Sequence, residues 1–136
     1  MCLIIDKRKH QSLKPIKLDK DLIVSKGLVS RKDDEWLVSD THFKFANFVT
    51  PYRQKSVHFL FGRAILRAKL DKPYYRDYSW RINKGIHAWL CKNNLMFLTY
   101  SLYNAVIPKG TKVYFGMSGD IVAEKLIIYK KWRQQK

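Results

Sequence analysis

The sequence predicts a single α+β domain that is rich in β-structure, with an antiparallel sheet and a C-terminal β-meander. Three observations favour this fold class. Short runs of β-branched and aromatic residues recur along the chain, helical periodicity is scarce, and turns rich in glycine and proline separate the last strands. With 136 residues, the chain has the size of one domain, residues 1–136, and can bury a core.

Strands are expected throughout the first half of the chain. Residues 22–29 are β-branched with one glycine, residues 36–38 form a short second strand, and residues 43–49 alternate at period two until Pro51 stops them. Residues 56–70 are ambiguous. Alternation of Val57, Phe59 and Phe61 favours a strand, whereas the spacing of residues 63–70 also suits a helix; extended structure interrupted at Gly62 is the preferred interpretation.

The C-terminal half gives the clearest local pattern. Residues 86–90 predict a strand, residues 96–98 a short helical turn, and residues 99–107 a further strand. A turn at 108–111, a strand at 112–116, a glycine turn at 117–120 and a strand at 121–129 follow. This succession of strand and turn predicts an antiparallel meander.

The charge of the chain predicts an anionic partner. There are 27 Lys and Arg against 11 Asp and Glu, a net charge of +16, which raises the self-repulsion of the folded state. Six acids lie in residues 19–40, and from residue 41 to residue 119 the only acids are Asp71 and Asp77. We therefore expect nucleic acid as the partner, in preference to a nucleotide or an acidic protein surface.

The candidate site lies in this cationic middle segment, where aromatic residues are interleaved with the cations. Cations bind phosphates and planar rings stack on bases, so the combination is typical of nucleic-acid sites. The cations expected to contact phosphates are Arg53, Lys55, Arg63, Arg67, Lys69, Arg76 and Arg81, and the rings expected to stack are Tyr52, Tyr75 and Tyr78. The basic clusters at residues 7–10 and 130–133 are interpreted as solvated tails.

The location expected from the sequence is the cytoplasm. The apolar run that follows Cys2 is only three residues long, too short for a signal peptide, and no stretch approaches the roughly 18 apolar residues of a membrane span. Two cysteines, Cys2 and Cys91, do not make a disulfide framework. No membrane partner and no cofactor are expected.

Several short landmarks occur along the chain: the Met-Cys-Leu start, Thr50-Pro51-Tyr52, Gly85-Ile86-His87, and the segments 107–111 and 121–123. Together they resemble a loose family of small uncharacterised proteins from gut anaerobes and their phages. These landmarks are spread over most of the chain and cover about a quarter of its residues. The resemblance implies an accessory protein of a mobile element, acting in the host cytoplasm if phage-encoded, and implies no activity.

Enzymatic and metal chemistry have little support in the sequence. Cys2 could act as a nucleophile if Met1 were removed, and His87, Tyr100 or Tyr103, and Glu124 occur in the order of ADP-ribosyltransferase residues, without that family's sequence around the glutamate. The histidines at 10, 42, 58 and 87 have no ligand at metal-binding spacing. No phosphate-binding glycine loop occurs, and Asp33, Asp34 and Glu35 are more typical of a solvated turn than of a nuclease.

The hypothesis that follows is a non-enzymatic protein that binds nucleic acid through a cationic surface studded with aromatic rings. The alternative is a phage inhibitor that sequesters a phosphorylated nucleotide signal or masks a host defence protein. A structural protein packed against a genome is a third interpretation. The first predicts an extended basic stripe, whereas the second predicts a compact pocket with converging cations.

Overall fold

The computed structural model describes residues 3–30, 37–40, 54–90 and 101–133, and these residues form strands and turns only. The predicted α+β class is therefore wrong, because the described part of the chain is all-β. Residues 63–67, for which a helix was the alternative, alternate between exposed and buried side chains at period two and form a strand. The predicted helical turn at 96–98 and the predicted strand at 43–49 lie outside the described residues.

Thirteen strands are present in the described ranges, and every pairing between them is antiparallel. In chain order they are β1 (Leu3–Ile4), β2 (Ile16–Lys17), β3 (Leu22–Ser30), β4 (Leu37–Asp40), β5 (Gln54–Val57), β6 (Arg63–Arg67), β7 (Tyr74–Arg76), β8 (Ser79–Ile82), β9 (Ile86–Trp89), β10 (Ser101–Ile107), β11 (Lys112–Phe115), β12 (Asp120–Ala123) and β13 (Lys125–Arg133). The predicted antiparallel, β-rich character is confirmed.

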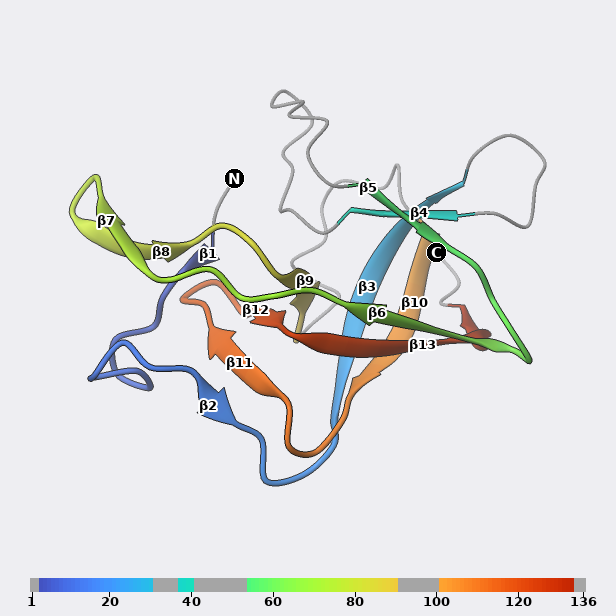
Figure 1. The fold of residues 1–136 in the computed structure, drawn as a ribbon, viewed down its shortest axis with the longest axis horizontal. Helices are drawn as coiled ribbons and strands as arrows, with labels where there is room; N and C mark the ends of the chain where they lie inside the picture. Colours follow the sequence, from blue (N-terminus) through green and yellow to red (C-terminus); the bar gives the residue numbers. More distant parts are fainter. Residues whose placement is uncertain (1–2, 31–36, 41–53, 91–100, 134–136) are drawn as a thin grey trace.

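Two sheets make up the fold (Figure 1). The large sheet has the order β2-β11-β12-β9-β3-β10-β13-β6, with β4 paired to β3 and β5 paired to β4. The small sheet has the order β1-β8-β7 and lies at the opposite end of the molecule from β4 and β5. An isolated bridge between Ile5 and Gly116 joins the two sheets.

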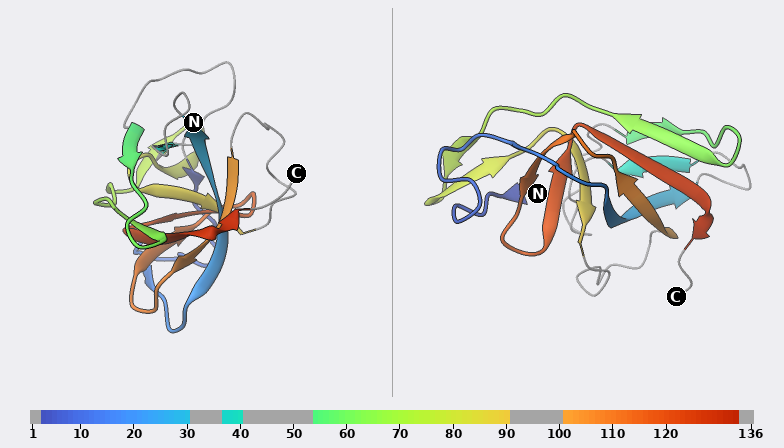
Figure 2. Two further views of the ribbon diagram at one scale, coloured as in Figure 1. Left: turned by 90° about the vertical axis from the view of Figure 1, so that its right-hand side faces the viewer. Right: turned by 90° about the horizontal axis from the view of Figure 1, so that it is seen from below.

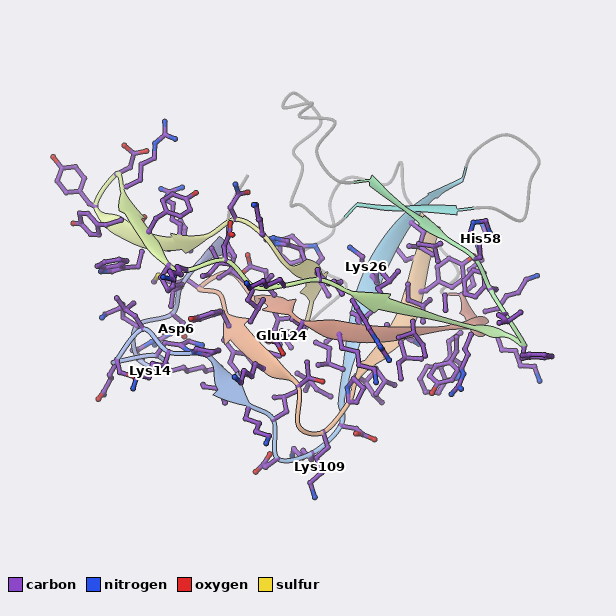
Figure 3. The ribbon with its side chains drawn as sticks, viewed as in Figure 1. Asp6, Lys14, Lys26, His58, Lys109 and Glu124 are labelled. Carbon is purple, nitrogen blue, oxygen red and sulfur yellow. The ribbon has the colours of Figure 1, made fainter. Side chains whose placement is uncertain are left out.

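The predicted C-terminal meander is only partly right. Strands β11 and β12 form a hairpin through the glycine turn, as expected. However, β10 pairs with β3 and β13, and β12 pairs with β11 and β9, so neither β10–β11 nor β12–β13 is a hairpin. Both sides of β10 are already hydrogen-bonded to long strands, and β11 therefore finds its second partner in β2. The predicted strand at 121–129 is divided at Glu124, which Figure 3 labels between β12 and β13.

Most of the large sheet folds over one apolar core. Inward side chains come from both ends of the sheet, including Leu66 on β6, Leu126 on β13, Val24 on β3 and Ile86 on β9. These four side chains are less than 5% exposed. Because a sheet brings its distant strands to one core only by curling, the sheet is strongly bent (Figure 2), and its outer face exposes Ile23 of β3, Ile65 of β6 and Trp132 of β13.

A second core lies between the small sheet and the β11–β12 hairpin. It contains Leu3, Ile5, Ile82, Tyr114 and Val122. Strand β12 therefore has apolar contacts on both faces, and all four of its residues are buried. Burial on both faces explains why residues 121–123 are continuously apolar and do not alternate.

Candidate nucleic-acid interface

A long extended segment forms one margin of the molecule and carries most of the predicted cations. Strand β6 is the last strand of the large sheet and pairs with β13. The chain then runs without turning through residues 68–73 into β7, so that residues 63–76 span the molecule in Figure 1 and in the right-hand view of Figure 2. Backbone hydrogen bonds from Ala68 N–H to Glu124 and from Asp71 N–H to Lys84 hold this segment against the body.

The apolar side chains of this segment are mostly buried or half-buried, whereas its cations are exposed. On β6 the buried Ala64 and Leu66 alternate with the exposed Arg63, Ile65 and Arg67, which the period-two geometry of a strand places on the outer face. Fourteen residues span at most about 45 Å when fully extended. We call residues 63–76 the basic edge; its exposed cations are Arg63, Arg67, Lys69, Lys72 and Arg76.

The two acids in or next to the basic edge lie beside basic residues. The Asp71 carboxylate accepts the backbone N–H of Lys84 at 3.2 Å, and the Lys84 ammonium lies 4.0 Å from it. Asp77 follows the basic edge directly and lies 3.8 Å from the Arg76 guanidinium, where both side chains are exposed. An exposed pair at that distance is weak and is exchanged easily for a phosphate contact.

The β7–β8 hairpin projects from the body at one end of the basic edge (Figure 1). Arg81 is half-buried, and its Nε donates to the Arg76 carbonyl at 3.2 Å and to the Ser79 hydroxyl at 3.1 Å. The Tyr75 ring is 58% exposed and packs against Trp80 with a centroid distance of 5.4 Å. This end of the basic edge therefore combines cations with an aromatic ring, Tyr75, that packs against Trp80.

Each end of the basic edge is bounded by a tight turn that exposes an aromatic ring. Phe61 and Gly62 connect Leu60 to Arg63 with φ of 54° and 80°, and Asp77 and Tyr78 connect Arg76 to Ser79 with φ of 50° and 64°. Two consecutive residues at positive φ are the mark of a type I′ turn. Phe61 is 97% exposed and Tyr78 is 96% exposed.

The structure thus brings together most of the residues that the sequence singled out. Arg63, Arg67, Lys69 and Arg76 lie along the basic edge, and Tyr75, Tyr78 and Arg81 lie on the hairpin at its end. Lys55 lies apart from them on β5, where it pairs with Ser39 of β4. Tyr52 and Arg53 lie outside the described residues.

The interpretation of residues 130–133 as a solvated tail is wrong, because these residues belong to strand β13. Leu126 and Ile128 anchor that strand in the core, and the N–H of Lys130 donates to the Gly62 carbonyl at 2.9 Å. The strand therefore adds Lys130, Lys131, Trp132 and Arg133 beyond the Arg63 end of the basic edge, where Lys131 and Trp132 lie near Phe61 and Gly62. The apolar positions 126 and 128 could have revealed this, since they continue the alternation into the basic cluster.

The second predicted tail, residues 7–10, is also folded onto the body. The Asp6 carboxylate accepts hydrogen bonds from the backbone and side chain of Arg8, and this lowers the pKa of Asp6. The Lys9 ammonium lies 4.6 Å from the centroid of the Phe115 ring. His10 is buried with its Nε2 accepting the N–H of Phe115 at 2.8 Å.

The residues that the sequence offered for metal binding or catalysis are only partly described. Within them no group of three or more His, Cys, Asp or Glu is placed to hold a metal ion. His87 is buried with Nε2 2.8 Å from the Asn83 carbonyl oxygen, and it alternates with Ile86 and Ala88 of the first core, to which Tyr103 belongs. Cys2, Tyr100 and Cys91 lie outside the described residues.

Comparisons of the chain with family models, with curated proteins and with solved structures found no match. The argument about function therefore depends on the geometry of this chain. In the described ranges no helix has the length and apolar character needed to cross a membrane.

Proposed function

We propose that this protein binds nucleic acid without acting as an enzyme, and that the basic edge is its main contact surface. The observation that carries the proposal is the continuous run of five exposed cations on residues 63–76, with an exposed aromatic ring at each end. A linear polyanion needs a linear set of cations, and the aromatic rings supply surfaces on which bases can stack. The resemblance to phage proteins adds a role as a mobile-element accessory protein in the host cytoplasm.

The same geometry favours nucleic acid over sequestration of a free nucleotide. A nucleotide signal requires several cations that converge on one pocket. The groove beside the basic edge is lined by Asp21, Phe61, Gly62, Val106, Tyr129, Lys131 and Trp132. Lys131 is the one cation among these described lining residues, whereas the exposed cations of the basic edge are spaced along an extended chain.

Neutralising part of the basic edge tests the proposal. The triple variant Arg63→Gln/Arg67→Gln/Lys69→Gln removes three cations from it, and affinity for a 20-nucleotide DNA should fall at least tenfold at low salt. Each lost phosphate contact also reduces the slope of log K against log salt by about 0.7 for single strands and 0.9 for duplex DNA. Fluorescence anisotropy across a salt series measures both quantities.

A matched control has the same change in charge elsewhere. Lys14, Lys17 and Lys20 are exposed around β2, at the other end of the large sheet from β6. The variant Lys14→Gln/Lys17→Gln/Lys20→Gln should retain most of the affinity and the salt slope. Equal losses in the two triple variants would show that overall charge, and not the basic edge, binds the polyanion. Absence of binding by the unmodified protein to DNA and RNA would refute the proposed function.

A further inference from the structure

A groove of about 540 Å³ opens on the outer face of the large sheet, beside the basic edge. Phe61, Tyr129 and Trp132 supply its aromatic surfaces and Val106 an apolar one. The Tyr129 and Trp132 rings meet edge to face, with centroids 5.3 Å apart. Lys131 and Asp21 are its charged residues, and the Asp21 carboxylate accepts the N–H of Lys109 at 2.7 Å.

The groove exists because β13 separates from β10 while it stays paired with β6. Ala105 of β10 pairs with Ile128, but Tyr103, two residues earlier, pairs with Arg133, so the register shifts between the two pairs. Over the same stretch Tyr129 still pairs with Arg63, and Lys130 bonds to Gly62. The bulge on β13 includes Lys131 and Trp132, and both residues line the groove.

Phe61 has no structural reason to be an aromatic residue. Its φ of 54° lies in the left-handed region, which costs a residue with a Cβ atom on the order of 1 kcal/mol. Its ring is 97% exposed and therefore gains almost nothing from packing. Asn is the favoured residue at this position of a type I′ turn before glycine. A strained backbone that places a ring in solvent beside an aromatic groove points to a ligand that covers the ring.

We infer that this groove takes an unstacked nucleobase, so that the protein selects single-stranded over duplex nucleic acid. The inference rests on the proposed function, since the basic edge supplies the phosphate contacts. Bases that stack on aromatic side chains are a common feature of single-strand recognition. Arg63 pairs with Tyr129 in the neighbouring strand, so a phosphate bound at Arg63 brings the next base to the groove. In a duplex the same base is held between its neighbours and is not available.

Three 12-nucleotide DNA ligands with matched backbone length separate base contacts from phosphate contacts: a thymidine oligomer, an abasic oligomer and a duplex. The thymidine oligomer should bind about five- to 150-fold more tightly than the abasic one for each base that stacks. Trp132→Ala and Phe61→Asn should each remove most of this difference and leave the affinity for the abasic oligomer unchanged. Met117→Ala, a control at an exposed apolar residue in the β11–β12 turn, should change neither affinity.

Thermal unfolding of the same variants tests the role of Phe61. Phe61→Asn relieves the backbone strain and should raise Tm while it weakens binding of the thymidine oligomer, an outcome that a residue retained for stability does not give. Equal affinity for the thymidine and abasic oligomers, or tighter binding of the duplex, would overturn the inference while the proposed function stands. Binding of none of the three ligands would overturn both.

Discussion

At the scale of single residues, the buried polar groups tie the loops to the sheet. Nε2 of His10 accepts the N–H of Phe115, and its Nδ1 lies 2.9 Å from the carbonyl oxygen of Lys14. These two contacts correspond to the Nδ1–H tautomer, in which one nitrogen accepts and the other donates. The Tyr114 hydroxyl donates to the carbonyl of Leu13 at 3.1 Å. These hydrogen bonds tie the loop that follows β1, which carries the basic residues 7–9, to strand β11.

Asp120 is a buried acid whose charge costs stability at neutral pH. It is 8% exposed, and burial raises the pKa of its carboxyl, although hydrogen bonds from its own N–H and that of Ser118 partly offset this. The pKa of Asp120 in the folded protein lies above the unfolded value of 3.8. The protonated carboxyl therefore contributes its full stability to the folded state below pH 3.8, and this contribution to the free energy of unfolding is lost as pH rises through the folded pKa. Asp120→Asn should therefore increase the free energy of unfolding at pH 7 and change it little near pH 3.

Urea denaturation at the two pH values measures this difference. Asp19→Asn is the matched control, because Asp19 is exposed, and it should have no effect at either pH. A loss of stability in Asp120→Asn at both pH values would contradict the prediction. It would show that the carboxylate makes hydrogen bonds that the amide cannot replace.

At the scale of the elements, Gly85 fixes how β8 leads into β9. Its φ of 140° is unfavourable for other residues, and a Cβ atom there would overlap the side chains of Val122 and Leu70. Gly85→Ala should therefore cost about 2 kcal/mol or more in urea denaturation, because it adds crowding in the core to backbone strain.

Gly110→Ala separates the two causes. Gly110 also has a positive φ, 89°, but the nearest atom to an added Cβ is Lys17 Cε at 3.9 Å. Only backbone strain remains at this position, and the cost should be about 1 kcal/mol. Equal costs at the two glycines would mean that the side chains of Val122 and Leu70 move aside.

Several strands could be predicted from the sequence, but not β2, β7 or β8, and the order of the strands could not be predicted. β3, β9 and β10 coincide with predicted strands within two residues, because their β-branched side chains point to a half-buried surface. The order failed because neighbouring strands in sequence were assumed to pair. The seven-residue pairing of β10 with β3, from Ser101 with Leu28 to Ile107 with Leu22, joins segments about 80 residues apart and leaves no local signal.

Much of the candidate site could be predicted from its charge and from the tyrosines among the cations, whereas the aromatic residues of the groove could not. Arg63, Arg67, Lys69 and Arg76 were identified because acids are rare around them. Phe61 was expected to follow the strand alternation of Val57 and Phe59, yet it occupies a two-residue turn with Gly62. The turn lies between two alternating runs, 57–59 and 64–66, and this pattern is the signal that could have located it.

At the scale of the whole molecule, the net charge of +16 makes the fold and the proposed complex respond to salt in opposite ways. Raising the salt concentration from 10 mM to 100 mM shortens the Debye length from about 30 Å to about 10 Å and weakens the repulsion among like charges. We expect Tm of the free protein to rise by a few degrees over this range, while affinity for nucleic acid falls.

Differential scanning fluorimetry across a salt series measures the effect on Tm. The triple glutamine variants lower the net charge from +16 to +13, and both should show a smaller rise than the unmodified protein. A Tm that falls with added salt would mean that attractive ion pairs, such as Asp6 with Arg8, outweigh the repulsion.

The pairing of β6 with β13 has a consequence for synthesis of the protein. Residues 63–67 leave the ribosome well before residues 125–133, which are their only strand partner in the described sheet. Until those later residues emerge, the Arg63–Arg67 segment has no neighbouring strand to hold it extended, and the groove has no Tyr129 or Trp132. A nascent chain next to ribosomal RNA therefore carries its positive charge without the assembled surface, and the proposed recognition of single strands requires nearly the whole described chain.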